Sequence, residues 1–256
     1  MTRTALVTGA GRGIGRAIAE TFHARGWRVG VFDVDGDAAE ALASSHEHML
    51  AGTMDVRDED AWTSALERLC GPSGGLDLLV NNAGLLRSGP FATMPVADHR
   101  VQVDVNVSGT LLGARLAHHR LARSRGMLLN LCSASAIYGQ PMLATYGATK
   151  AAVKSLTEAL DLEWRGDGVR VRSLLPLFVD TDMVSGDATG AASVQRLGVR
   201  LTTDDVARAA WRTWSERGVP LRGPHRVVGR QTLALRSAAS VAPDWVVRQA
   251  IRLTSG

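Results

Sequence analysis

Apolar runs typical of buried β-strands alternate with helix-patterned segments along nearly the whole chain, and this alternation constrains the fold more than any other feature. Strands buried on both faces read as near-continuous apolar runs, and the helices between them supply the crossovers that parallel strands need. The expected strands are Thr4–Thr8, Arg28–Phe32, His48–Asp55, Leu76–Val80, Met127–Leu131, Val169–Leu175 and His225–Val228. The expected helices are Gly13–Arg25, Asp37–Ser45, Glu59–Leu69, Val96–Leu121, Tyr146–Trp164 and Asp204–Glu216, the last with Thr202 or Thr203 as its N-cap. With right-handed crossovers, the pattern predicts an α/β fold with a doubly wound parallel sheet covered by helices on both faces.

Length and composition fit one folded unit. The chain has 256 residues, of which 45% are hydrophobic, and it shows no convincing linker and no internal repeat. We therefore predict a single domain over residues 1–256. Residues 185–193 (SGDATGAAS) have a linker-like composition, so we interpret 185–200 as a mobile loop beside the substrate and 231–256 as a helical C-terminal tail.

Charge and cysteine usage argue against several classes of function. The formal net charge is +4, but the arginines are scattered without a basic run, which is not the pattern of a nucleic-acid-binding protein. Cys70 and Cys132 are the only cysteines and the histidines lack supporting ligands, so we expect no disulfide framework and no metal site. Without a signal-peptide pattern or a long apolar run, we expect a cytoplasmic protein with no stable membrane insertion.

A glycine-rich turn, TGAGRGIG at 8–15, joins the first expected strand to the first expected helix. Gly9, Gly13 and Gly15 would let the backbone turn tightly and let a pyrophosphate approach the helix N-terminus. Asp33 ends the second strand, where a carboxylate accepts hydrogen bonds from ribose hydroxyls and repels a 2′-phosphate. These residues favour NAD over NADP. Arg12 is the opposing observation, because a basic residue in this turn suits a 2′-phosphate, and Asp33 could also be only a turn residue in DVDGD.

Tyr146 and Lys150 stand four residues apart in a predicted helix, thirteen residues after Ser133. Among the 29 basic residues only Lys150 and Lys154 are lysines, and a compact ammonium differs from a guanidinium beside a ligand. Residues i and i+4 share a helix face, so we expect the Lys150 charge, together with that of an oxidised nicotinamide, to favour the Tyr146 phenolate. Tyr146 would then exchange a proton with a substrate hydroxyl that Ser133 holds. The set predicts hydride transfer between a nicotinamide and an alcohol or ketone.

Two residues compete with these assignments. Ser135 is a second candidate for the hydroxyl that holds the substrate oxygen, although the thirteen-residue spacing favours Ser133. Tyr138 is a second candidate base, but Met142 stands where the activating lysine would be needed. We therefore expect Tyr138 to line the substrate cleft.

The motifs TGAGRGIG (8–15), Asp55-Val56, NNAG (81–84), Asn106, Ser133 and Tyr146-x-x-x-Lys150, in this order, resemble the classical short-chain dehydrogenases/reductases over roughly residues 2–230. The resemblance implies a Rossmann-type sheet of about seven strands, with Asp55 and Val56 at the adenine and Thr181 on the nicotinamide side. Asn106 stands in the middle of the long expected helix and can break its backbone pattern. The resemblance also implies that it holds a water linking Lys150 to solvent. The expected catalytic residues are Ser133, Tyr146, Lys150 and Asn106. The expected cofactor-binding residues are Gly9, Arg12, Gly13, Ile14, Gly15, Asp33, Asp55, Val56, Asn82, Ala83, Gly84, Tyr146, Lys150, Val179 and Thr181.

Two features depart from the family pattern. The family commonly has Pro-Gly after the sixth strand, whereas this chain has Pro176-Leu177, and we expect the leucine to narrow the space beside the nicotinamide. The common VDGG ending is also absent, and an amphipathic segment at 243–253 stands in the tail instead. We expect a homodimer or homotetramer, although this ending puts the usual tetramer interface in doubt.

The residues expected to line the substrate are mostly aliphatic, which suits a hydrophobic secondary alcohol or its ketone. They are Leu85, Leu86, Ala134, Tyr138, Leu143, Phe178, Met183 and Val184. Two other readings stay open, an NADP(H)-dependent ketoreductase of the 3-oxoacyl type and a cofactor-binding regulator without turnover. An epimerase or dehydratase acting on a nucleotide sugar is disfavoured, because it needs a larger C-terminal substrate domain.

Overall fold

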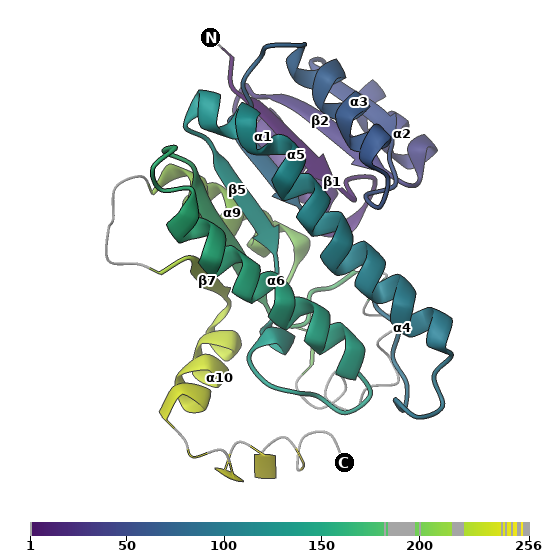
Figure 1. Cartoon of the computed structure of the whole chain (residues 1–256), viewed down its shortest axis with the longest axis vertical. Helices are drawn as coiled ribbons and strands as arrows, with labels where there is room; N and C mark the ends of the chain where they lie inside the picture. The colour runs from purple at the N-terminus through teal and green to yellow at the C-terminus, as the bar shows by residue number, and fades with distance from the viewer. Residues whose placement is uncertain are drawn as a thin grey trace.

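A computed structural model gives the arrangement of the chain (Figure 1). It describes residues 2–181, 183, 198–199, 201–216, 223–241, 243, 245–246, 248–249 and 252. Val184, most of the expected substrate loop at 185–200 and much of the tail beyond 241 lie outside the described residues.

Seven parallel strands form one sheet in the order β3-β2-β1-β4-β5-β6-β7. The strands are β1 (Thr4–Thr8), β2 (Arg28–Asp33), β3 (Met49–Thr53), β4 (Leu78–Asn81), β5 (Met127–Leu131), β6 (Arg170–Pro176) and β7 (His225–Val228). The strand order reverses direction between β1 and β4, and ligands of doubly wound sheets bind at the carboxyl ends beside this point. The predicted doubly wound parallel sheet of about seven strands is therefore confirmed.

Helices cover both faces of the sheet. They are α1 (Gly13–His23), α2 (Gly36–Ser44), α3 (Glu59–Cys70), α4 (Val96–Val103), α5 (Gly109–Ser124), α6 (Ala144–Glu163), α9 (Thr203–Ser215) and α10 (Arg230–Val241). Side chains of α1, α2 and α9 share one buried cluster with one face of the strands, and those of α3 and α5 share a second cluster with the other face. Alternation along β1 shows the division, because Ala5 and Val7 join the first cluster and Leu6 joins the second.

The predicted helix over Val96–Leu121 is interrupted. A π-helical turn (Asp104–Ser108) separates α4 from α5, and the buried Asn106 lies in it. Single π-turns are frequent at functional sites. Elsewhere the predicted boundaries hold within a few residues. At α9 the N-cap is Thr202, the first of the two candidates, because its hydroxyl and the Asp205 carboxylate form a capping box.

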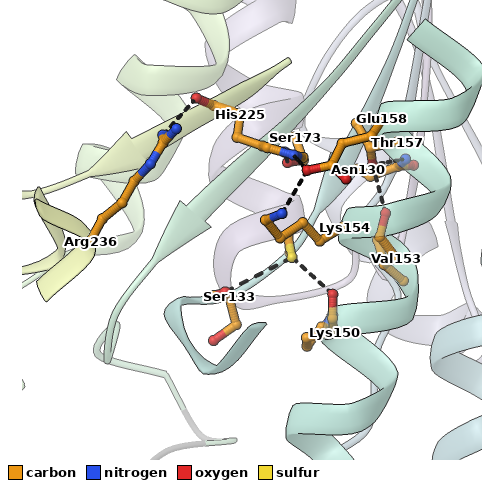
Figure 2. Close-up of polar contacts among 11 residues, drawn as sticks. Asn130, Ser133, Lys150, Val153, Lys154, Thr157, Glu158, Ser173, His225 and Arg236 are labelled. Carbon is orange, nitrogen blue, oxygen red and sulfur yellow. Dashed lines mark hydrogen bonds and ion pairs between the residues drawn. The ribbon is translucent and has the colours of Figure 1, made fainter. Parts of the chain in front are cut away.

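A buried row of polar residues crosses four strands at matching positions, where Asn81, Asn130, Ser173 and His225 are neighbours in register. Asn81 Nδ2 donates to Asn130 Oδ1 at 3.1 Å, and Ser173 Oγ lies 2.7 Å from His225 Nδ1. Figure 2 shows how α6 lies over this row.

Helix α6 is tied to the row at two points. Asn130 Nδ2 donates to Thr157 Oγ1 at 3.0 Å, and His225 Nε2 lies 2.8 Å from Glu158 Oε1 (Figure 2). The Asn130–Thr157 bond is buried and demands one geometry, since an unpaired buried group costs about 1–3 kcal/mol. The row therefore fixes the position of α6, the helix that carries Tyr146 and Lys150.

Candidate active site

The loop after β1 depends on glycines for its shape. Gly9 and Gly13 have φ of +61° and +56°, which L side chains rarely adopt. A Cβ on Gly15 would collide with the carbonyl oxygen of Gly9 and lie 2.5 Å from Asn82 Nδ2. Thr181 lies opposite the turn, with its Cγ2 3.5 Å from the place of a Cβ on Gly13. The glycines thus leave backbone exposed at the start of α1, a cradle that fits the pyrophosphate of a dinucleotide.

Arg12 and Ile14 flank the first glycine of α1. Arg12 is the residue before the helix and has an extended backbone. Ile14 is partly buried against the core cluster of α1 and α9. Val179 is buried after β6 and forms an isolated bridge with Leu201. Val179 thus belongs to the same buried cluster that Ile14 packs against.

Asp33 faces the glycine turn from the end of β2. Its Oδ2 accepts the Gly11 N–H at 2.8 Å, and its Oδ1 accepts the Asp35 N–H at 3.0 Å. The bond to Asp35 is the one expected of a turn residue in DVDGD. The bond to Gly11 fixes the carboxylate beside the glycine-rich turn. An ionised carboxylate offers about four acceptor sites, so Asp33 can also accept hydroxyl hydrogens.

Asp55 and Val56 follow β3. Arg57 donates from Nε to both carboxylate oxygens of Asp55, at 2.9 and 3.0 Å, and this hydrogen bonding is the main cause that lowers the pKa of Asp55. Val56 is buried, and its carbonyl oxygen accepts the Trp62 indole N–H at 2.9 Å. The segment is therefore held rigidly beside the sheet, with the Asp55 carboxylate ionised.

The NNAG segment joins the end of β4 to the glycine turn. Asn82 Nδ2 donates to the carbonyl oxygens of Thr8 at 2.8 Å and Gly9 at 2.9 Å. Thr8 Oγ1 accepts the N–H groups of Asn82 and Ala83 at 3.1 and 3.0 Å. Two loops far apart in the sequence are thereby fixed at the switch point of the sheet.

Tyr146 and Lys150 occupy the first turns of α6. Lys150 is buried, its Nζ lies 5.6 Å from the centre of the Tyr146 ring, and it donates to the carbonyl oxygen of Leu131 at 2.9 Å. A Cβ on Gly84 would lie 3.6 Å from the same Nζ. The ammonium is thus fixed between β5, the end of β4 and the tyrosine ring.

The pKa of Tyr146 in the protein alone is set by burial. Burial raises the pKa of Tyr146 to about 12, and a hydrogen bond with Ser133 offsets only part of this rise. Burial also lowers the pKa of Lys150. The expected stabilisation of the phenolate by Lys150 together with the oxidised nicotinamide stays a prediction.

Ser133 stands two residues after the end of β5 and caps the short 3-10 turn Ala134–Ala136. Its Oγ accepts the Ser135 N–H at 3.2 Å and donates to Ser135 Oγ at 3.3 Å. Ser135 Oγ donates to Gln140 Oε1 at 3.0 Å, and Gln140 Nε2 donates to the Tyr138 hydroxyl at 2.9 Å. The two competing candidates, Ser135 and Tyr138, therefore belong to a network that supports Ser133. Sequence reasoning missed the buried Gln140, because a lone glutamine carries no spacing signal.

Asn106 connects the π-turn to the strand ends. Its Oδ1 accepts the Leu85 N–H at 2.7 Å, and its Nδ2 donates to Leu85 O at 2.8 Å and to Thr149 Oγ1 at 3.0 Å. Thr149 Oγ1 in turn donates to the carbonyl oxygen of Tyr146. The side chain thus links the segment after β4 to α6, through an extra residue that only a π-turn accommodates.

An apolar cluster lies beside Tyr146. Its buried members are Leu86, Ala134, Leu143, Leu177 and Phe178, and the partly buried residues against it are Ile137, Met142, Tyr146, Met183 and Leu235. Most of the expected substrate-lining residues gather here, whereas Leu85 and Tyr138 are held by the polar contacts described above. Leu177, the departure from the family's glycine, is 8% exposed and packs in the cluster. Leu235 of α10 was not expected, because the C-terminal tail offered no motif to align.

Comparison with known proteins adds the class of the protein. A family model described as short chain dehydrogenase matches residues 3–191. The chain belongs to the short-chain dehydrogenase family. It is 34% identical over 192 residues to the 2-(R)-hydroxypropyl-CoM dehydrogenase of Xanthobacter autotrophicus, covering 72% of this chain and 77% of that protein.

Solved structures give the same class. The 3-ketoacyl-(acyl-carrier-protein) reductase of Brucella melitensis complexed with NADH matches with a TM-score of 0.81 and 30% identity, over 88% of this chain and 96% of that one. The gluconate 5-dehydrogenase of Burkholderia cenocepacia in complex with NADP and tartrate matches with a TM-score of 0.80 and 25% identity, over 91% and 95%. This short-chain dehydrogenase is therefore an NAD(P)-dependent oxidoreductase that acts on secondary alcohols.

In the described part of the chain, no helix combines the length and apolar character needed to cross a bilayer. Within the same residues, no group of three or more His, Cys, Asp or Glu is arranged to hold a metal ion.

Proposed function

We propose that this short-chain dehydrogenase is an NAD(H)-dependent enzyme that interconverts a hydrophobic secondary alcohol and its ketone, with Tyr146 as acid and base. The observation that carries the proposal is the placement of the Tyr146 ring, between the fixed ammonium of Lys150 and an apolar cluster. NAD, when bound, supplies a nicotinamide ring that accepts hydride in oxidation and returns it in reduction.

The proton transfer belongs to Tyr146. As hydride leaves the carbinol carbon, the phenolate takes the hydroxyl proton, and in reduction the phenol returns it to the forming alkoxide. Lys150 stabilises the phenolate by its charge, since its Nζ is held in place by Leu131 O. The Ser133 hydroxyl, turning its hydrogen from Ser135 Oγ, donates to the same substrate oxygen and orients it.

Asn106 has a positioning role in this proposal. It holds Leu85 and Thr149 and thereby sets the segment after β4 against α6. A water held at this site and linked to Lys150, as the family resemblance implies, would return the proton to solvent.

The preference for NAD rests on Asp33. The carboxylate is fixed beside the glycine turn by Gly11 and keeps acceptor capacity for the two adenosine ribose hydroxyls. A 2′-phosphate there would meet a negative charge. An NADP(H)-dependent ketoreductase of the 3-oxoacyl type is the second candidate, favoured by Arg12 at the start of α1.

A fluorescence titration with NADH and NADPH tests the cofactor assignment first. Clearly tighter NADH binding supports Asp33, and tighter NADPH binding favours the second candidate. Asp33→Ala should weaken NADH binding and reduce the discrimination against NADPH. Because that change also removes two turn hydrogen bonds, Asp33→Asn serves as the matched variant that keeps an acceptor without the charge.

Turnover of secondary alcohols by wild type and Tyr146→Phe tests the catalytic assignment. Removing a positioned acid–base group costs about 10²–10⁴-fold in rate, whereas NADH binding should stay near the wild-type value. Full activity in Tyr146→Phe would show that another residue transfers the proton. NADH binding without turnover of any alcohol or ketone by the wild type would favour a non-catalytic regulator.

We also propose that the protein forms a homodimer or homotetramer. Leu111 of α5 is 45% exposed and Leu162 of α6 is 67% exposed. Both helices cover the same face of the sheet, so these exposed leucines support an interface between copies of the chain. Light scattering of wild type and Leu162→Glu tests it, and a monomeric wild type would refute it.

A further inference from the structure

Helix α10 has a fixed rotation about its axis. It starts at Arg230 and is joined to β7 by Gly229 alone, whose φ of +89° suits glycine. Thr232 is fully buried and its Oγ1 donates to the carbonyl oxygen of Val228 at 2.7 Å. Arg236 Nη1 reaches the carbonyl oxygen of His225 at 3.4 Å (Figure 2). These contacts attach the helix to the last strand along one side.

The rotation divides the leucines of α10 between two environments. Leu235 is partly buried and packs against the apolar cluster beside Tyr146, with Leu177 and Phe178 among the buried members. Leu233, two residues earlier on the same helix, is 57% exposed. Figure 1 shows α10 at the same end of the molecule as the first turns of α6. One helix therefore offers both a residue at the cluster and a matched residue in solvent.

We infer that Leu235 is a specificity-determining residue, which closes the apolar side of the substrate site and limits the length of the alkyl group on the carbinol carbon. This inference rests on the proposed function, because the carbinol must reach the Tyr146 hydroxyl at the border of this cluster. Leu177 and Leu235 meet in the same cluster from two elements, so both limit the space beside Tyr146. Its substrates are secondary alcohols with a short apolar group on the side facing α10.

The test compares kcat/KM of wild type, Leu235→Ala and Leu233→Ala for unbranched secondary alkanols of increasing chain length. One methylene in an apolar pocket changes discrimination by about 10–200-fold. Leu235→Ala should therefore raise the ratio of kcat/KM for a long over a short alkanol by at least about 10-fold. Leu233→Ala should keep the wild-type ratio. An unchanged ratio in Leu235→Ala would overturn the inference.

A second variant covers the case in which Leu235→Ala fails to fold. Leu235→Phe keeps an apolar contact and enlarges the side chain, so it should favour shorter alkanols than the wild type, and an unaltered preference would again overturn the inference. NADH affinity should stay the same in all variants, since the cofactor cradle lies elsewhere. Failure of the proposed function is distinguishable, because the wild type itself would then turn over no alkanol.

Discussion

The ionisation of Tyr146 is directly measurable, because the chain contains only two tyrosines. Replacing Tyr138 by Phe leaves Tyr146 as the one phenol, and absorbance titration then follows its phenolate alone. Burial raises the pKa of Tyr146 to about 12. This is about two units above the usual value for tyrosine, which corresponds to roughly 3 kcal/mol.

The expected midpoint of the titration is therefore near pH 12 in the protein alone. Saturating NAD⁺ should lower the midpoint, because it places a positive charge beside the phenol. The size of this decrease measures how far the base is activated for oxidation of an alcohol. A cofactor that left the midpoint unchanged would contradict Tyr146 as the base.

Unfolding at high pH must be followed in parallel. An unfolded tyrosine ionises near pH 10, whereas Tyr146 in the fold resists ionisation until about 12. The raised pKa thus gives stability that is present below about pH 10 and is lost as the pH rises toward 12. Tryptophan fluorescence reports the folded fraction at each pH. A midpoint at or below 10 in a protein with native fluorescence would refute the reasoning, since the Lys150 charge would then outweigh burial.

Three further predictions follow from the same structure. Gly15→Ala should weaken NADH binding by at least about 10-fold, because its Cβ would collide with the carbonyl oxygen of Gly9; an unchanged affinity in the fluorescence titration would contradict the cradle. Thr202→Ala should remove the α9 capping box and cost about 1 kcal/mol, which lowers Tm by about 2–4 °C, and an equal Tm would show that the cap is unimportant. Burial lowers the pKa of His225, so its contribution to stability is present above about pH 6.5 and should be lost as the pH falls below that value. Denaturant titrations at several pH values should therefore show a smaller loss of unfolding free energy in His225→Gln than in the wild type; an equal loss in the two proteins would contradict this.

Local patterns in the sequence were sufficient for most of the fold. The buried strands could be located because apolar runs of this length are recognisable without knowing which strands pair. Thr202 was one of the two N-caps expected for α9, because capping depends on a few neighbouring residues. The glycine turn was equally local. Its left-handed backbone at Gly9 and Gly13 is a property that only glycine adopts freely.

Other features depended on contacts between distant segments. Gln140 supports Ser133 only because a loop folds back, and no spacing in the sequence indicates this. Leu235 reaches the apolar cluster through the position of α10 on β7. The pKa of Tyr146 depends on burial by several elements. The i+4 spacing indicates only that the positive charge of Lys150 lies on the same helix face. The π-turn at Asn106 likewise follows from its bonds to Leu85, across the site.

The position of the switch point between β1 and β4 also bears on how such an enzyme can be redesigned. The cradle and Asp33 belong to the strands on one side of this line, and the apolar cluster is built almost wholly from segments after residue 85 on the other side. The backbone pairing of β1 with β4 and the bonds of Asn82 to Thr8 and Gly9 join the two halves at the line itself. A chimaera that exchanges the first half for that of a relative should therefore inherit a new coenzyme preference without altering the choice of alcohol.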